Sequence, residues 1–481
     1  MRKRLPAHAK PLAWLIGIYV LVFFSLACRR YSVFGWDTGD FGNFHDMFWW
    51  TLRGRPFYFP SRGMSNFGLH AAFLWAQLVP VFWLFPSVTT LIFMQSLFIG
   101  LAGVPVYLIA RKLFDKHQTA LVLTAAFLLL PPIVSQHVNQ VEEPSFLIVY
   151  LLFAFYFFMQ QRFGLFLLFA AIACLGRENV PLAVMMFGVY AALQRRSWKW
   201  IATPIVGGGV YFALVTFVLM PHFRAGQTWD VTNRMFAYLG TSTQAIVLNA
   251  LTRPGLVIDH LLGEEDVRYF VLLVQPMAWV LPFLSIGSLM ALPDLAINLV
   301  ADNGALKVIG WHYNMITGSF LFIGAMFGLK RVCGWVRARY ANGSTETVAA
   351  CALLLLVAAH WFTWLQPAQF RSLPYQASLE RAISAVPPDG SVLVPPDLQG
   401  AVSGREHWYI TSALIQKPEF AAQFEYVILD ANEVRFSPVV TQEFFDSLYK
   451  NPRYQLIFAE RNVFVFHRLG GASDWKVPPP S

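Results

Sequence analysis

Residues 31–70 read YSVFGWDTGDFGNFHDMFWWTLRGRPFYFPSRGMSNFGLH and lie between the first two long apolar runs of the chain. Aromatic residues such as Trp36, Trp49 and Trp50 are mixed here with acids and bases, and such aromatic side chains prefer the interface between membrane and water. We interpret the stretch as the rim of an active site that opens at a membrane surface. The alternative is an interfacial loop with ordinary surface salt bridges. The acidic and basic residues concerned are Asp37, Asp40, His45, Asp46, Arg53, Arg55, Arg62 and His70.

The composition around this stretch is that of a multipass membrane protein. Of the 481 residues, 56% are hydrophobic and 13% are charged, whereas about 25% of a soluble protein is charged. The apolar residues gather in long blocks, which predicts an α-helical protein with about eleven transmembrane helices. The run 69–86 contains Pro80 and predicts interfacial helices within a first outer loop at 31–88. The predicted spans are roughly 11–28, 89–110, 119–134, 144–159, 163–176, 180–193, 200–220, 269–284, 286–301, 314–328 and 347–365.

The distribution of charge predicts the side of the membrane that each loop occupies. The formal net charge is +9, but the basic residues stand mostly at the ends of apolar runs, so topology explains them and no nucleic-acid partner is expected. With the N-terminus inside, 15 basic residues fall in short inner loops, as the positive-inside rule requires. We predict an integral plasma (inner) membrane protein with a cytoplasmic N-terminus. The inner basic residues are Arg2, Lys3, Arg4, Lys10, Arg111, Lys112, Lys116, Arg162, Arg195, Arg196, Lys199, Lys330, Arg331, Arg337 and Arg339.

The tail of the chain follows a different pattern. Its apolar blocks are short and alternate with turns, which predicts strands, and a helix-like stretch lies near 437–450. We predict a transmembrane domain over 1–365 and a small α/β domain over 366–481 outside the membrane, large enough for a core of its own. The predicted strand segments are 391–396, 407–411, 425–432, 454–460 and 462–469.

Two carboxylates that could carry chemistry occur in the sequence WDTGD, at Asp37 and Asp40. Carboxylates three residues apart can share a helix face or a tight turn. Beside a cavity, one can act as a general base while the other binds a metal or orients the base. For Asp40 a structural role stays open, because Asp caps helices well and a helix can begin near Phe41. We predict both as catalytic residues.

A second polar station, QHVNQVEEP at 136–144, joins two spans on the same outer face. Glu142 and Glu143 precede Pro144, where the dipole of the next helix favours acids. That explanation does not cover His137. Carboxylate and imidazole groups can bind a divalent cation, so we predict a possible Mg²⁺ or Mn²⁺ site from Glu142, Glu143 and His137, although the spacing matches no known signature.

Two further stations contain ionisable residues inside or beside apolar runs. Arg177 and Glu178 stand between short apolar segments, and ionisable groups at membrane depth are costly unless they serve a function. Arg177 is suited to bidentate binding of phosphate. A local Arg177–Glu178 balance is the alternative, but adjacent helical residues do not face each other. His312 and Tyr313 are expected at the outer mouth, where interfacial anchoring is the alternative role.

In the order and spacing of these motifs the chain resembles the predicted multipass membrane proteins of the domain of unknown function 2079 family. The chain departs from the family pattern at Gly42, where a second acid is usual, and at Arg177 and Asn179, which replace Lys and Asp. The matching segments are Trp36 to Phe41, Asn66 to His70, Gln136 to Pro144, Arg177 to Asn179, Pro293-Asp294 and His312-Tyr313.

This layout is similar to that of C-type (GT-C) glycosyltransferases, which take a sugar from a polyprenyl-phosphate carrier. The resemblance implies transfer of a sugar from such a lipid to a glycan, lipid or protein acceptor on the outer face, with Asp37 as base. The partners would be the polyprenyl-phosphate sugar and membrane lipid. Alternatives are a transporter or flippase of lipid-linked sugar and a non-catalytic envelope assembly factor. The predicted substrate- and phosphate-binding residues are Arg62, His70, Arg177, Glu178, His312 and Tyr313.

Overall fold

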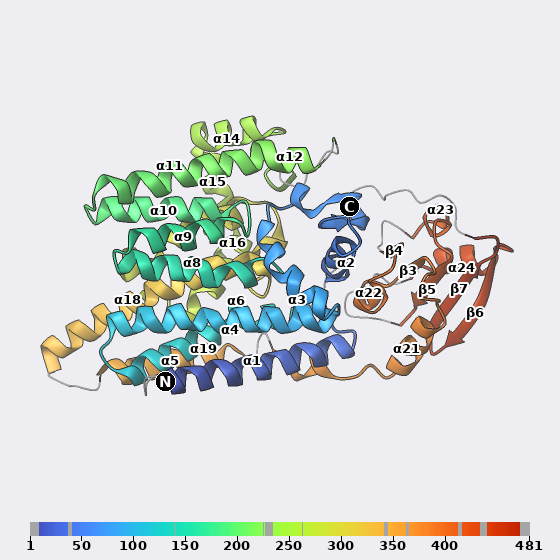
Figure 1. The fold of residues 1–481 in the computed structure, drawn as a ribbon, viewed down its shortest axis with the longest axis horizontal. Coiled ribbons are helices and arrows are strands. Elements are labelled where there is room, and N and C mark those ends of the chain that lie inside the picture. Colours follow the sequence, from blue (N-terminus) through green and yellow to red (C-terminus); the bar gives the residue numbers. More distant parts are fainter. Residues whose placement is uncertain are drawn as a thin grey trace.

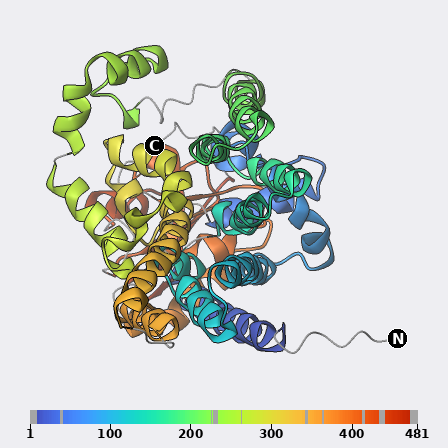
Figure 2. The ribbon, with the colours of Figure 1, turned by 90° about the vertical axis from the view of Figure 1, so that its left-hand side faces the viewer.

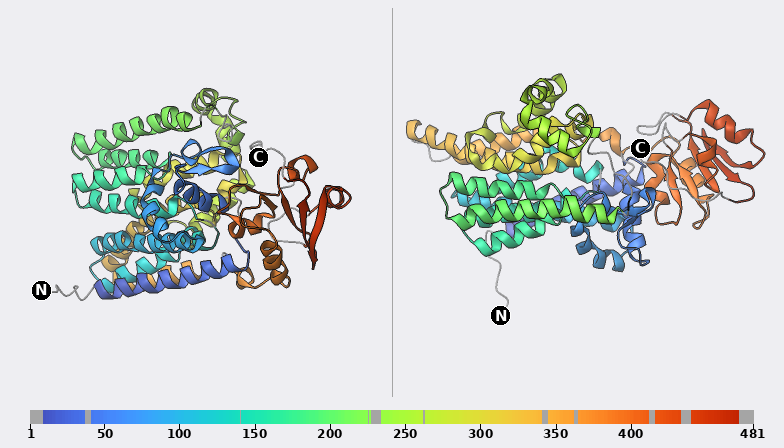
Figure 3. Two further views of the ribbon diagram at one scale, coloured as in Figure 1. Left: turned by 45° about the vertical axis from the view of Figure 1, so that its right-hand side comes forward. Right: turned by 90° about the horizontal axis from the view of Figure 1, so that it is seen from above.

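The computed structural model describes residues 9–36, 41–139, 141–224, 226, 234–261, 263–340, 345–361, 365–411, 416–432 and 440–471. It consists of a long helical bundle with a small mixed sheet beyond one end of the bundle, and the views in Figure 1 and Figure 3 agree on this arrangement. Seen from the opposite end, in Figure 2, many bundle helices appear nearly end-on, so they run roughly parallel to one another.

The bundle helices occupy the apolar runs of the sequence. Most neighbouring helices run in alternate directions, so their connections collect at the two ends of the bundle (Figure 1). The main helices are α1 (Ala9–Ser32), α4 (Val88–Leu113), α5 (His117–Leu128), α6 (Pro131–Val134), α7 (Gln136–Asn139), α8 (Pro144–Met159), α9 (Phe163–Cys174), α10 (Val180–Leu193), α11 (Trp198–Leu214), α18 (Met315–Tyr340) and α19 (Thr345–Ala359).

By length and apolar composition, 4 helices of the described chain can cross a membrane, and 5 can do so if one bent pair is counted as a span. The bent pair joins His117–Leu128 to Pro131–Asn139 at 59°. Helices such as α8, α9 and α10 are apolar but shorter than the roughly 20 residues of a straight span. The membrane character is therefore clear, while the number of eleven spans stays a prediction.

Small residues allow two of the shorter helices to pack closely. A Cβ atom on Gly188 of α10 would lie 2.5 Å from the Ile201 carbonyl oxygen of α11, and a Cβ atom on Gly208 would lie 2.9 Å from the Pro181 carbonyl oxygen. Only glycine at these positions lets the two backbones approach this far, which is a common device of helices in membranes. The outward face of α11 remains exposed and apolar, at residues such as Val206, Val210 and Leu214.

The predicted span over 269–284 is wrong as a single helix. α16 (Glu264–Val274) ends at Val274, and the chain continues as two 3₁₀ segments, η5 (Gln275–Met277) and η6 (Leu281–Leu284). Ala278 and Trp279 between them have positive φ angles of 54° and 57°, which a continuous right-handed helix does not allow. Apolar composition alone could not reveal this break. The segments around it are η4 (Val215–Leu219, a π-helix), α12 (Met220–Phe223), α14 (Thr243–Thr252), α15 (Pro254–Leu261), η7 (Ile286–Ala291), α17 (Leu292–Val300), η8 (Gly304–Lys307) and η9 (His312–Asn314).

The first outer loop lies at the end of the bundle that faces the sheet (Figure 1). Its apolar run forms a short helix over Phe73–Leu84 rather than a long span, which agrees with the predicted interfacial helix. The strands β1 and β2 pair antiparallel and place Tyr58 opposite Ser65. The elements of this loop are α2 (Phe41–Thr51), β1 (Tyr58–Phe59), η1 (Pro60–Arg62), β2 (Met64–Ser65), η2 (Asn66–Gly68), η3 (Phe73–Leu78) and α3 (Val79–Leu84).

The tail forms a five-stranded sheet in the order β4-β3-β5-β7-β6. The pairs β4–β3 and β3–β5 are parallel, and the pairs β5–β7 and β7–β6 are antiparallel. All five strands lie within the segments that the sequence pattern predicts. The elements are η10 (Pro367–Phe370), α21 (Gln376–Ser384), β3 (Val392–Val394), η11 (Pro396–Leu398), α22 (Gln399–Val402), β4 (Trp408–Ile410), α23 (Pro418–Ala421), β5 (Tyr426–Asp430), α24 (Gln442–Tyr449), β6 (Tyr454–Glu460) and β7 (Val463–Arg468).

Buried residues cover the two faces of this sheet. One cluster includes Leu379, Val392 and Ile428, and the other includes Leu393, Phe424 and Phe444. Both clusters are separate from the large core of the bundle. A sheet with helices on both faces is one of the standard ways to bury apolar side chains. The domain boundary at residue 366 stays a prediction.

Candidate active site

A polar cluster gathers where the turn 175–179 meets the first outer loop, at the end of the bundle that faces the sheet. The turn exists because α9 ends at Cys174 and α10 begins at Val180, with Pro181 in its first turn. Glu178 of this turn binds the first outer loop with both carboxylate oxygens. Its Oε1 lies 2.9 Å from Nδ1 of His70, and its Oε2 accepts a hydrogen bond of 3.1 Å from the amide of Ala71.

Arg177 lies beside this pair and is almost completely buried, with 8% of its surface exposed. Its Nη1 is 3.9 Å from Oε2 of Glu143, and its guanidinium carbon lies 5.6 Å from the centre of the Tyr313 ring. Within the described residues its guanidinium donates no hydrogen bond that meets normal distance limits. An arginine side chain has five N–H donors, and no described residue accepts a hydrogen bond from those of Arg177.

Glu142 and Glu143 stand directly before α8, which begins at Pro144. Oε1 of Glu143 accepts a hydrogen bond of 3.2 Å from the indole of Trp75. The backbone amide of Glu142 donates to Gln95 Oε1 at 3.3 Å, and the Glu142 carboxylate lies 3.6 Å from Nδ1 of His312. Both acids are buried, so the two carboxylates depend on these neighbours rather than on water.

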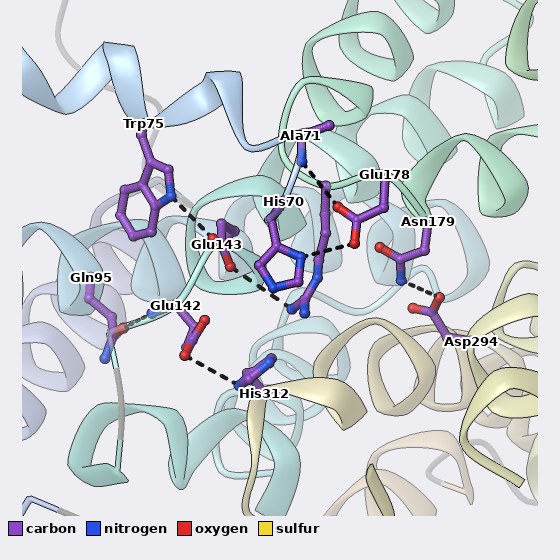
Figure 4. Close-up of polar contacts among 11 residues, drawn as sticks. His70, Ala71, Trp75, Gln95, Glu142, Glu143, Glu178, Asn179, Asp294 and His312 are labelled. Atoms are coloured by element: carbon purple, nitrogen blue, oxygen red, sulfur yellow. Dashed lines mark hydrogen bonds and ion pairs between the residues drawn. The ribbon is translucent and has the colours of Figure 1, made fainter. Parts of the chain in front are cut away.

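The remaining contacts join the turn 175–179 to the segment after residue 290. Asn179 donates a hydrogen bond of 2.7 Å to Asp294 of α17. His312 and Tyr313 begin the segment that leads into α18, and their rings are 3.9 Å apart. Figure 4 shows side chains from widely separated segments of the chain gathered here, with dashed lines for the contacts between them.

The structure therefore brings together five of the six predicted substrate-binding residues: His70, Arg177, Glu178, His312 and Tyr313. Arg62 lies elsewhere, at the end of η1 beside the sheet. Burial raises the pKa of Tyr409 in β4, and the charge of Arg62 opposes this rise. Asp37 and Asp40 lie outside the described residues, so their catalytic roles stay predictions.

His137, Glu142 and Glu143 have separate hydrogen-bond partners in the structure, and the metal site that they would form stays a prediction. Nε2 of His137 is 2.9 Å from the hydroxyl of Tyr19, and Nδ1 is 3.2 Å from the hydroxyl of Ser96. Both ring nitrogens of His137 thus have hydroxyl partners inside the bundle. In the described part of the chain no group of three or more His, Cys, Asp or Glu side chains is placed to hold a metal ion.

Three residues of the cluster were not predicted from the sequence: Trp75, Gln95 and Arg224. Gln95 is an amide inside the apolar run of α4, and a polar residue in such a run is a signal that could have been used. Arg224 donates a hydrogen bond of 2.7 Å to the carbonyl of Gly68, two residues before His70. Trp75 gave no signal, because an aromatic residue in an interfacial helix is ordinary.

The electrostatics of the turn favour ionised side chains. Burial alone would raise the pKa of Glu178, but His70 and Arg177 outweigh burial and lower it to about 2. Burial alone would lower the pKa of Arg177, but the carboxylates around it, Glu143 first, raise it above its ordinary value. The turn thus holds a permanent cation and a permanent anion at neutral pH.

Solved structures with a similar fold were found. ArnT from Cupriavidus metallidurans bound to undecaprenyl phosphate has a TM-score of 0.53 and 12% identity, over 96% of this chain and 99% of that chain. ArnT in the apo state has a TM-score of 0.52 and 11% identity, over 93% and 97% of the two chains. The archaeal oligosaccharyltransferase AglB from Archaeoglobus fulgidus, in complex with an inhibitory peptide and a dolichol-phosphate, has a TM-score of 0.46 and 12% identity, over 87% and 69%.

At these identities the similarity to ArnT shows the fold, which is the GT-C-like architecture predicted above. No curated protein matches the sequence. The family model described as "Predicted membrane protein (DUF2079)" matches residues 34–463, which include every segment of the polar cluster. The chain therefore belongs to the DUF2079 family of predicted membrane proteins.

Proposed function

We propose that the protein is a membrane glycosyltransferase that moves a sugar from a polyprenyl-phosphate-linked donor to an acceptor on the outer face of the membrane. The GT-C-like fold supports the class of enzyme. The ArnT structure with this fold is bound to undecaprenyl phosphate, which supports a lipid carrier of the same chemical type.

The observation that carries the proposal is the state of Arg177. A buried guanidinium is costly unless it is paired, yet its carboxylate neighbour Glu143 is 3.9 Å away, beyond hydrogen-bonding distance. A phosphate oxygen can enter such a site and accept the N–H groups in a bidentate arrangement. The apolar helices around the cluster would then receive the polyprenyl chain, while the phosphate rests at the polar end.

His70 supplies a second group for the phosphate. Glu178 holds Nδ1 of the imidazole, so the ring has one orientation and Nε2 is free of hydrogen bonds to the described residues. The His70 side chain is 31% exposed, so a ligand can reach it. Glu142 and Glu143 would keep His312 and Arg177 in place and repel a misplaced anion.

In the proposed reaction, the acceptor hydroxyl attacks the anomeric carbon of the donor sugar and its proton passes to the carboxylate of Asp37. The bond between the anomeric carbon and the phosphate oxygen breaks, and the electron pair stays on the phosphate. The configuration at the anomeric carbon is inverted. Arg177 and His70 stabilise the charge that develops on the phosphate, which is the kind of interaction that contributes most to catalysis.

We also propose that the polar cluster and the sheet face outward from the inner membrane, with the N-terminus in the cytoplasm. The basic residues that begin or end the bundle helices support this orientation. Lys10, Arg111, Arg162, Arg195 and Lys199 stand at helix ends opposite the cluster, as the alternation of helix directions in Figure 1 requires.

The test uses the full-length protein in lipid nanodiscs with a panel of polyprenyl-phosphate sugars. Binding of the lipid and release of the sugar are followed for wild type, Asp37→Asn, Arg177→Lys and Arg177→Gln. The matched control is Arg162→Gln, which removes an exposed arginine at the opposite end of the bundle. Each reaction is run with added Mg²⁺ or Mn²⁺ and with a chelator, because a divalent ion is part of the prediction from the sequence.

Sugar release that Asp37→Asn abolishes, and that Arg177→Gln reduces more than Arg177→Lys, supports the glycosyltransferase. Lysine keeps the charge but loses the planar fork of donors, so the order of the two Arg177 variants reports bidentate binding. Binding of the lipid without sugar release in any form points to a transporter instead. Absence of binding to every lipid phosphate overturns the proposal.

A further inference from the structure

A second polar contact joins α2 to the segment between α22 and β4, where the first outer loop meets the sheet (Figure 1). Asp46 of α2 is 1% exposed. Its Oδ1 accepts a hydrogen bond of 2.6 Å from the backbone amide of Gly404, and its Oδ2 accepts one from the indole N–H of Trp408. Each carboxylate oxygen thus has one donor from the far end of the chain.

Two glycines, Gly42 and Gly400, allow close packing between the first part of the chain and the segment 399–408 near Asp46. A Cβ atom on Gly42 would lie 2.6 Å from Cη2 of Trp408, and the Gly42 amide donates to Oε1 of Gln399 at 3.0 Å. On the other side, a Cβ atom on Gly400 would lie 2.9 Å from the ring of Tyr31, whose hydroxyl donates to the Gly400 carbonyl at 3.1 Å. No larger residue fits at either position without moving the partner.

The donor at Gly404 also depends on glycine. Its φ angle of +85° is in the left-handed region, where a residue with a Cβ atom is strained. This conformation turns the Gly404 amide toward Asp46. A Cβ atom there would also lie 3.1 Å from the His45 ring. The segment is therefore shaped to present an N–H group to a carboxylate on α2.

A buried carboxylate is a costly way to join two surfaces. Burial raises the pKa of Asp46 to about 7, although the hydrogen bonds from Gly404 and Trp408 and the charge of Arg405 lower it. An apolar contact would hold the surfaces together at a smaller cost, but it would permit sliding and rotation. A carboxylate with two directed donors allows one orientation only, so its benefit lies in geometry.

We propose that Asp46 is a positioning residue that sets α2 in a defined orientation through Gly404 and Trp408. The Phe44 ring of α2 lies 5.2 Å from the ring of Trp75, which donates to Glu143 of the polar cluster. The tail then serves the reaction by holding α2 in place beside this cluster. That link to the reaction rests on the proposed function, whereas the contact itself does not and can be measured without any substrate.

The experiment measures backbone hydrogen exchange by mass spectrometry on the full-length protein in nanodiscs. Asp46→Asn keeps the shape but can no longer accept from both donors. We expect exchange of the α2 peptide 41–51 and of the peptide around Gly404 to increase about tenfold. Peptides from α4 and α8 should keep the rate of wild type. The control is Asp446→Asn, which changes an exposed carboxylate on α24.

A second variant protects the test against loss of folding. Gly42→Ala should push α2 away from Trp408, because the added Cβ atom would clash with the Trp408 ring. Trp408→Phe removes the indole donor without adding a Cβ atom to α2, and it should also increase exchange of the α2 peptide. Gly164→Ala is the matched control, since a Cβ atom at Gly164 meets no atom within 4 Å.

Local loosening of α2 and of the Gly404 segment in Asp46→Asn, Gly42→Ala and Trp408→Phe supports the proposal. Unchanged exchange of α2 in Asp46→Asn and Trp408→Phe overturns it, and so does an equal increase in α4 and α8, which would indicate general destabilisation. If wild type transfers sugar, Asp46→Asn should lower kcat about tenfold with little change in KM for the lipid. Absence of transfer by wild type, with the exchange response intact, would refute only the proposed function.

Discussion

Both ends of the helix bundle contain buried acids, but the distances from these carboxylates to the neighbouring basic groups differ. At the basic end, Glu346 is 3% exposed, and its Oε1 is 2.8 Å from Lys330 and 3.1 Å from Arg337. At the other end, Glu143 is 3.9 Å from Arg177, and Glu142 is 3.6 Å from His312. The first network is closed by direct contacts. In the second, Arg177 and Glu143 are too far apart for a hydrogen bond, as expected if a ligand takes part in this contact.

The difference follows from what each network does for the fold. Glu346 joins α18 to α19, and both cations are partly exposed, so water and protein share the cost of the charges. The polar cluster joins segments that are far apart in sequence, and its Arg177 is buried. A buried cation with loose contacts reduces stability, and proteins tolerate that cost mainly at functional sites. Four changes test this contrast.

Replacing Arg177 should have the largest effect. Arg177→Gln removes the proposed phosphate-binding cation, and we expect turnover to fall by about 10²–10³, the usual cost of losing one preorganised donor at a developing charge. Arg337→Gln at the basic end is the control and should leave the turnover of folded protein unchanged. Steady-state sugar release in nanodiscs measures both. Equal losses in the two variants would contradict a functional difference between the two ends.

Replacing Glu346 tests the closed network. Glu346→Gln leaves Lys330 and Arg337 without their shared carboxylate, and we expect a loss of about 1–2 kcal/mol in the free energy of unfolding, because both cations can reach water. Thermal unfolding of the solubilised protein measures the change. Asp446→Asn, which breaks an exposed pair with Lys450, should cost less stability than Glu346→Gln. A loss of turnover in folded Glu346→Gln protein would contradict a purely structural role for Glu346.

Acid titration tests the charge of Glu178 in the polar cluster. The pKa of Glu178 in the folded protein is about 2, below its ordinary value of 4.5. Its contribution to stability is therefore present above pH 4.5 and is lost as the pH falls toward 2. Glu178→Gln should be less stable than wild type at pH 7 and should show a smaller decrease in melting temperature between pH 5 and pH 3. We also expect about tenfold lower turnover, since His70 loses its orienting partner.

The smallest effect is expected at His137, and this variant tests the predicted metal site. His137→Phe keeps a ring in the bundle but leaves Ser96 without its imidazole partner, while Tyr19 still donates to the carbonyl of Leu128. We expect a loss of about 1 kcal/mol in stability and no change in turnover. Metal analysis of purified protein should give the same divalent ion content as wild type. A lower metal content would support His137 as a ligand.

Much of the fold was predictable because most long apolar runs in the sequence correspond to helices of the bundle. The apolar runs located the bundle helices, Pro80 marked the run at 69–86 as a short helix, and the alternating segments after residue 390 located the strands. The failure at 269–284 has a local cause. The chain turns at Ala278 and Trp279 with positive φ angles, and neither residue type signals such a turn.

The site was predictable to the level of which residues share an end of the bundle. Alternating helices placed the loop 135–143, the turn at Arg177 and the His312 segment on one face, and the structure brings these segments together. Arg62 and His137 show where this reasoning stops. Both belong to segments that touch the site, but Arg62 lies beside the sheet and His137 points into the bundle.

The sequence by itself determined the helices, their alternation and the common end of the polar stations, because hydrophobic length and charge act locally along the chain. Only the tertiary structure decided the partners. Glu178 orients His70, and Glu143 approaches Arg177. The carboxylate of Asp46 accepts hydrogen bonds from the Gly404 amide and the Trp408 indole. These pairings depend on how helices lie side by side and on the direction of each side chain, and neither is encoded in the spacing of residues along one segment.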